Sequence, residues 1–157
     1  MDRIDAAFSR RVRVSNDIAP YKDVQICIVH GQQTGRLGVI EMKGNDAETI
    51  SVTGVERTLI DIAVRPVYSG GVFEVLKAYR LAKDTVSVNR LVAVLKKMNY
   101  AYPYHQVIGF YLERAGYKES SIQLLRKIPM RLDFYLEHGI TDRDYSKEWR
   151  LYFPKGF

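Results

Sequence analysis

The chain has 157 residues, of which 46% are hydrophobic and 11% aromatic, and this composition predicts one folded domain over residues 1–157. No apolar run approaches the roughly 18 residues of a membrane span, the N-terminus lacks a signal-peptide core, and the single cysteine, Cys27, excludes a disulfide framework, so we expect a cytoplasmic protein without membrane contact. The net charge of +6 favours an acidic partner, either nucleic acid or an acidic protein surface.

Residues 1–54 have the pattern of strands and turns. The segments VQICIVHG (24–31), LGVIEMKG (37–44) and TISVTG (49–54) predict three strands, and GQQTGR and GNDAE predict the turns between them. Since these turns contain Gly and Asn, we expect an antiparallel meander.

Residues 55–128 have the pattern of short amphipathic helices. Apolar residues recur at helical spacing in VERTLIDIAV, GVFEVLKAYRLAK, SVNRLVAVLKKM, YHQVIGFYLERAG and KESSIQLLRKI. Pro66, Ser87, Gly116 and Pro129 mark helix ends, because proline and glycine terminate helices and serine caps them.

Residues 130–157 alternate again between apolar and polar side chains, in MRLDFYLEHG and in EWRLYFP, with the charged segment ITDRDYSK predicted as a loop between them. The order of strands, helices and strands predicts an α+β fold. We expect a small, mainly antiparallel sheet built from both chain ends and a central bundle of four to five short helices.

Glu41 and Lys43 lie two residues apart on a predicted strand and therefore share a face. With Asp23 before the preceding strand they have the order of a PD-(D/E)xK nuclease, in which acids hold Mg²⁺ and a lysine orients water. The E-x-K pattern is short and arises often by chance. We favour a solvent-facing pair on a hairpin whose other face, with Ile40 and Met42, contributes to the core.

Six basic residues are candidates for binding nucleic acid or a partner. Arg10, Arg11 and Arg13 in SRRVRVS can grip phosphates or can mark a solvated edge strand, and the second interpretation is favoured. Arg150 and Lys155 lie among aromatic residues of the tail, an arrangement that stacks on bases or forms a half-buried strand. The histidines His30, His105 and His138 have no metal-ligand spacing, so we expect no metal and no cofactor.

The segment TGVERTLIDIAVRPVYSGGVFEVLKAY resembles the C-terminal domain of AbiEi-type antitoxins, the antitoxins of type IV toxin–antitoxin systems that act in phage abortive infection. The shared features are ERTLID at the start of a helix directly after a strand, then a proline and a GG pair, then an amphipathic helix. VIGFYLERAG resembles a later helix of the family, and the upstream VHGQQTGRLGV suits its sheet region. The resemblance covers about two thirds of the chain.

The resemblance implies a bacterial or archaeal protein that is not an enzyme. It also implies a partner, a nucleotidyltransferase-like toxin encoded beside the antitoxin, which the antitoxin antagonises or whose expression it controls. Family members usually carry an N-terminal winged helix-turn-helix that binds DNA for transcriptional regulation. Residues 1–54 have no such pattern, so we expect the C-terminal domain without it. The open alternatives are the metal-dependent nuclease and a non-catalytic basic module that binds nucleic acid.

The matched residues have a structural interpretation as well. Glu56 suits the positive N-terminal end of a helix dipole, and Arg57 and Asp61, four residues apart, can pair on one helix face. Arg57 is also a candidate contact for the partner. An uncovered edge strand would favour an oligomer.

Overall fold

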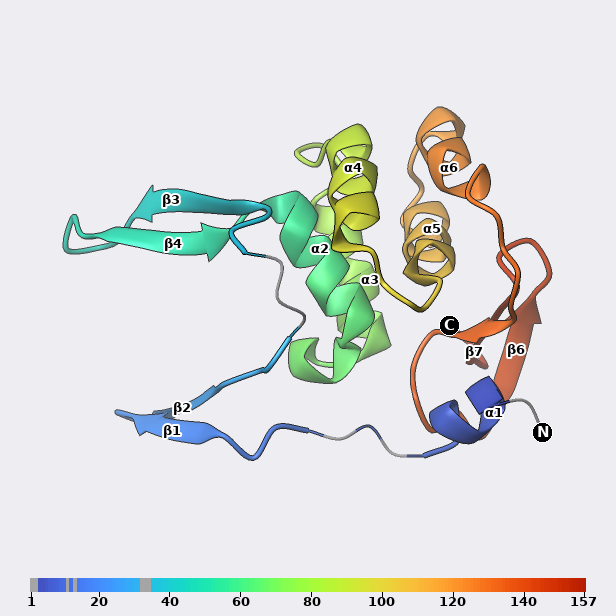
Figure 1. Cartoon of the computed structure of the whole chain (residues 1–157), viewed down its shortest axis with the longest axis horizontal. Helices are drawn as coiled ribbons and strands as arrows, with labels where there is room; N and C mark the ends of the chain where they lie inside the picture. Colours follow the sequence, from blue (N-terminus) through green and yellow to red (C-terminus); the bar gives the residue numbers. More distant parts are fainter. Residues whose placement is uncertain (1–2, 11, 13, 32–34) are drawn as a thin grey trace.

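Six α-helices and three small sheets make up the part of the chain that the computed structural model describes, residues 3–10, 12, 14–31 and 35–157 (Figure 1). The elements in chain order are α1 (Arg3–Phe8), β1 (Ile18–Tyr21), β2 (Val24–Cys27), β3 (Val39–Lys43), β4 (Thr49–Thr53), α2 (Val55–Val64), the 3₁₀ helix η1 (Pro66–Ser69), α3 (Val72–Leu81), α4 (Val88–Met98), α5 (Tyr104–Arg114), α6 (Glu119–Arg126), β5 (Phe134–Tyr135), β6 (Arg143–Ser146) and β7 (Leu151–Pro154). The fold is α+β, as predicted. Among these residues no helix has the length and apolar character needed to cross a bilayer.

Helices α2 to α6 form the core, and their bounds follow the sequence signals closely. Helix α2 ends one residue before Arg65, because Pro66 follows, and the Ser87 hydroxyl accepts a hydrogen bond from Arg90 N at 3.4 Å to cap α4. The apolar stripes of these helices pack together, and the largest fully buried side chains include Tyr79 and Tyr111. The predicted helical bundle is confirmed.

The C-terminal sheet has the order β5–β7–β6. Strand β7 pairs parallel with β5 and antiparallel with β6. The side chains of Trp149, Leu151 and Phe153 are buried, as their alternation predicts. The prediction of a loop over ITDRDYSK was wrong for Arg143–Ser146, because pairing with β7 makes this polar segment a strand.

Helix α1 was not predicted, and it packs against the C-terminal part of the chain (Figure 1). The ring of Phe8 is buried and stacks on Tyr135 and on His138, while Phe8 O accepts a hydrogen bond from Gly139 N at 2.7 Å. A helix of six residues gains its stability from such packing rather than from its own sequence. The two chain ends therefore meet through a helix.

The N-terminal strands form two separate hairpins, β1–β2 and β3–β4, that extend from the same side of the helical bundle (Figure 1). The expected three-stranded meander and the single sheet built from both chain ends were therefore wrong. Each hairpin closes through its own short turn, so β2 pairs with β1 and β3 pairs with β4, and these four strands form two separate two-stranded sheets. Part of the predicted GQQTGR turn, residues 32–34, lies outside the described residues.

Candidate binding cleft

The three residues of the nuclease hypothesis are distributed over two different sheets. Asp23 lies in the turn of β1–β2, whereas Glu41 and Lys43 lie on β3 of the other hairpin. Glu41 approaches Arg36 at 3.6 Å, and Lys43 Nζ donates to Thr49 Oγ1 at 3.0 Å. The neighbouring-strand arrangement that the hypothesis requires is absent from these three residues. Within the described part of the chain, no three acidic, histidine or cysteine side chains are grouped so that they could hold a metal ion.

Glu41 and Lys43 are exposed on the polar face of their hairpin, as expected. The expectation for the opposite face was wrong. Ile40 and Met42 are 45% and 51% exposed and do not enter the core, because no other element of the described chain covers this face.

Arg57, in the segment that carries the family resemblance, is occupied by contacts within the fold. Its Nε donates to both carboxylate oxygens of Asp61, at 2.9 and 2.8 Å, and its Nη1 donates to Leu37 O at 2.8 Å. The pair predicted from the i, i+4 spacing is therefore present, and the same guanidinium ties α2 to the chain before β3.

Arg150 and Lys155 belong to the C-terminal sheet and also have acidic neighbours. Arg150 Nε donates to Asp133 at 2.9 Å, which holds the pKa of that carboxyl below its ordinary value, and Lys155 lies 4.0 Å from Asp142. These side chains lie on a different element from Arg57. Arg57 lies in α2, whereas Arg150 and Lys155 flank β7, so these three predicted basic residues do not form one patch.

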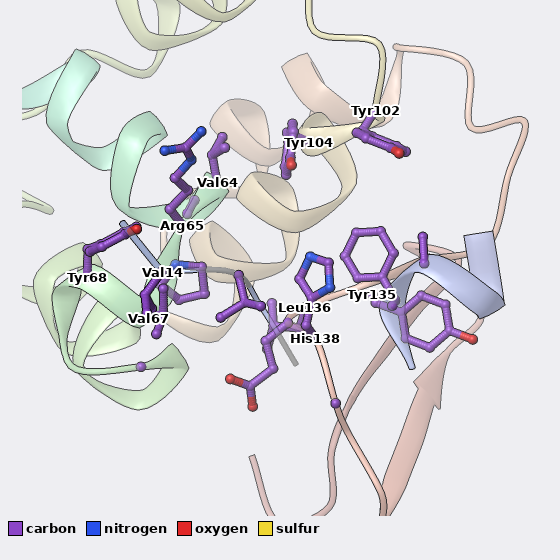
Figure 2. Close-up of a pocket in the computed structure, with 18 of the residues that line it drawn as sticks. Val14, Val64, Arg65, Val67, Tyr68, Tyr102, Tyr104, Tyr135, Leu136 and His138 are labelled. Atoms are coloured by element: carbon purple, nitrogen blue, oxygen red, sulfur yellow. The ribbon is translucent and has the colours of Figure 1, made fainter. Parts of the chain in front are cut away.

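A cleft of about 1400 Å³ lies between the N-terminal segment and the helical body. Figure 2 shows Val67 and Tyr68 on one side of it and Tyr135 and His138 on the other. The lining comes from five places far apart in sequence: described residues between 7 and 15, His30, residues within 63–71 at the end of α2 and in η1, residues within 99–104, and residues 135–139. Arg10 is among the lining residues, and Arg11 and Arg13 lie outside the described residues.

The N-terminal side of the cleft is attached to the helical side at one polar contact. Ser15 N donates a hydrogen bond to the Tyr68 hydroxyl at 2.7 Å, and the Ser15 hydroxyl in turn donates to Ile28 O at 2.6 Å. Tyr68 is held in place by η1 (Pro66–Ser69), whose C-terminal cap, Gly70, is in the left-handed region with φ 81°. The segment VYSGG (67–71) thus positions Tyr68 in the wall of the cleft.

The other side of the cleft is an aromatic cluster. The ring of His138 stacks on Phe8 with centroids 4.1 Å apart, and Tyr102 contacts Phe8 edge-on at 6.1 Å. Tyr104 contacts Tyr100 and Tyr102 at centroid distances of 5.0 and 6.3 Å. Aromatic pairs at these distances stabilise one another beyond the area that they bury. The aromatic contacts therefore hold these side chains of the wall against one another.

Burial determines the charge states in the cleft. It raises the pKa of Tyr104 to about 12, with the charges of Tyr100 and Tyr102 as smaller causes, and it raises the pKa of Glu137 above its ordinary value. Burial also lowers the pKa of His138, although contacts with backbone groups oppose this shift. At neutral pH Tyr104 and His138 are therefore uncharged hydrogen-bonding groups.

A second pocket of about 300 Å³ adjoins the cleft. The two share a wall made by Val64, Arg65, Tyr68 and Tyr100. Arg65 is half-buried at the C-terminal cap of α2, where its backbone N–H bonds to Asp61 O. Arg65 therefore lines both the cleft and the second pocket.

Sequence reasoning missed most of this site. His138 was expected to have a structural or solvent role, and the three tyrosines of NYAYPYH were not singled out. The available signal was their density, three tyrosines within five residues beside Pro103. The cleft itself depends on contacts between distant segments, which no local pattern encodes.

Comparison with known proteins finds no relative: the chain matches no protein-family model, no curated protein and no solved structure.

Proposed function

We propose that this protein is a non-enzymatic antitoxin or regulatory domain of the AbiEi type, which antagonises a nucleotidyltransferase-like toxin through contact at the cleft or controls its expression. The observation that carries the proposal is the cleft, in its size and its lining. Its volume of about 1400 Å³ exceeds the roughly 300–1,000 Å³ of small-molecule pockets, so it suits a segment of another protein better than a metabolite.

The chemistry of the lining supports a protein partner as well. Tyrosine and arginine are the residues that most often dominate the energy of protein–protein interfaces, and the cleft contains five tyrosines and two arginines. The tyrosine side chains offer apolar rings with a polar tip. Such a surface binds an extended or helical segment through both ring contacts and hydroxyl groups.

The family resemblance supports the same conclusion from the sequence. The ERTLID helix, α2, ends at the cleft, and the following Pro and GG pair form η1 and the entry of α3, which place Tyr68 in the wall. The polar residues of the motif therefore have an architectural role, with Arg57 bonded to Asp61 and Glu56 Oε1 accepting from Ser87 N at 3.2 Å. The motif builds the surface that the proposal uses.

The test is a growth-rescue assay in which the nucleotidyltransferase-like product of the adjacent gene is expressed alone and with this chain. Rescue of colony formation is the expected result. Arg65→Glu, which reverses a charge shared by both hollows, should abolish rescue. The matched control is Arg80→Glu, which reverses an exposed charge on α3 outside the cleft and should leave rescue intact.

A pull-down with the purified toxin separates direct contact from control of expression. Binding by the wild type and by Arg80→Glu, but not by Arg65→Glu, supports contact at the cleft. A chain that neither rescues growth nor represses the toxin gene would refute the proposal as a whole. Equal rescue by both variants would refute the assignment to the cleft.

A further inference from the structure

The hairpin β1–β2 presents one face with the side chains of a protein core. Because β1 and β2 pair with Tyr21 opposite Val24 and Ala19 opposite Ile26, these side chains share a face, and Ile28 continues it. The large members of this face, Tyr21, Val24, Ile26 and Ile28, are 50–56% exposed. An antiparallel sheet in a globular protein normally packs one such face on its core. Within the described chain this face has no cover.

The second hairpin repeats the pattern. Ile40 lies opposite Val52, and Met42 lies opposite Ile50, so these four aliphatic side chains share one face, while Glu41 and Lys43 lie on the other. Ile40, Met42 and Ile50 are 45%, 51% and 40% exposed. Both hairpins extend from the same side of the helical bundle, so a single partner can reach both (Figure 1). Two-stranded hairpins are marginally stable without such a cover.

The size of the two faces suits a stable interface. Seven large side chains, each about half exposed, offer on the order of 500 Å² of apolar surface, and the strand backbones add to it. This approaches the roughly 800 Å² that each partner contributes to a standard interface, and it matches the upper range of the largest apolar patch on a typical monomer. Together the two faces therefore offer much of the apolar surface that one side of a standard interface needs.

Charge and edge geometry narrow the choice of partner. Residues 17–54 carry three basic and five acidic side chains within a chain of net charge +6, so this region has a local net charge of −2, which favours a protein partner over nucleic acid. The bond from Ile28 N to Asp17 O places the backbone of Pro20 on the outer edge of β1, and proline has no N–H to donate. Pairing with an added strand is therefore disfavoured on that edge, and the apolar faces are the larger surface for contact.

We infer that a second copy of this chain covers these faces. The two apolar faces are alike in size and composition, so a two-fold axis can place β1–β2 of one copy on β3–β4 of the other and repeat the contact symmetrically. This is an isologous interface, and it closes at two copies without leaving either face exposed. The sheets then pack about 10 Å apart, as in other sheet-on-sheet contacts.

The test measures the mass of the full chain by sedimentation velocity over a range of concentrations. The expected mass is twice 18.1 kDa. Two matched pairs of variants place the same aspartate on opposite faces of each hairpin. Ile26→Asp and Met42→Asp, on the apolar faces, should give monomers. Gln25→Asp and Ser51→Asp, on the other faces of the same hairpins, should remain dimers.

Far-UV circular dichroism of each variant checks that the helices are intact. Ile26→Thr is a milder change, because it keeps a β-branched side chain, and it should raise the dimer dissociation constant at least about tenfold. A wild-type chain that is monomeric at every concentration would overturn the inference. Equal masses for all four aspartate variants would overturn the assignment to these faces. The measurement involves no toxin, so its result is independent of the growth-rescue assay.

Discussion

Gly109 lies in the middle of α5, where an added methyl group has no space. A Cβ built on Gly109 would lie 2.1 and 2.2 Å from ring atoms of Trp149, although such contacts are essentially never below 3.0 Å. Trp149 is fully buried, and its Nε1 donates to Glu113 at 2.9 Å, so the ring cannot move without losing that bond. Gly109→Ala should therefore strain the core.

The magnitude follows from two opposing terms. Overpacking a core costs about 1–3 kcal/mol, and here the upper end applies, whereas alanine gains up to about 1 kcal/mol of helix propensity over glycine. We expect a net loss of about 2 kcal/mol in the free energy of unfolding. For a chain of this length, that loss lowers Tm by about 4–8 °C in a thermal unfolding experiment followed by circular dichroism.

A double-mutant cycle tests the cause. The clash involves the six-membered ring of the Trp149 indole. Trp149→Phe replaces the indole with a smaller ring that does not reach as far, so Gly109→Ala should be nearly neutral or stabilising in the Trp149→Phe background. A neutral Gly109→Ala in the wild type would contradict this reasoning. An equal loss in both backgrounds would contradict it as well.

Three further substitutions test the electrostatics of the fold. The guanidinium of Arg126 contacts the carboxylates of Glu113, Glu119 and Glu148, and Arg126→Met removes it from all three. The free energy of unfolding should therefore fall by up to about 3 kcal/mol at pH 7 and by less at pH 4, as urea titrations at both pH values would show. Burial raises the pKa of Glu137, so the folded state binds its proton more tightly and loses stability as pH rises through that pKa; Glu137→Gln should raise Tm at pH 7 but not at pH 4. Arg57→Lys cannot bind both oxygens of Asp61, and we expect a loss of about 1–2 kcal/mol in chemical denaturation; an unchanged midpoint would contradict the role of this pair.

The helical part of the fold could be predicted from the sequence because its signals are local. The amphipathic stripes of α2 to α6 recur at helical spacing, and the proline, serine and glycine signals lie within three residues of the helix ends. Strand β6 could not be predicted, since Arg143–Ser146 has no apolar alternation and becomes a strand only through its pairing with β7. Helix α1 was missed for a similar reason, because contacts more than 100 residues away stabilise it.

The same distinction between local and distant signals explains the candidate sites. Glu41 and Lys43 could be placed on a polar strand face from their spacing alone, but their separation from Asp23 depends on which strands pair, and that is a property of the whole chain. Apolar alternation predicts that a strand has a face to bury, and it does not say where the cover comes from. For Ile40 and Met42 on β3 the alternation was interpreted as a face that packs on this chain's own core. Since the core is complete without them, the pattern is better explained by a surface that another protein molecule covers.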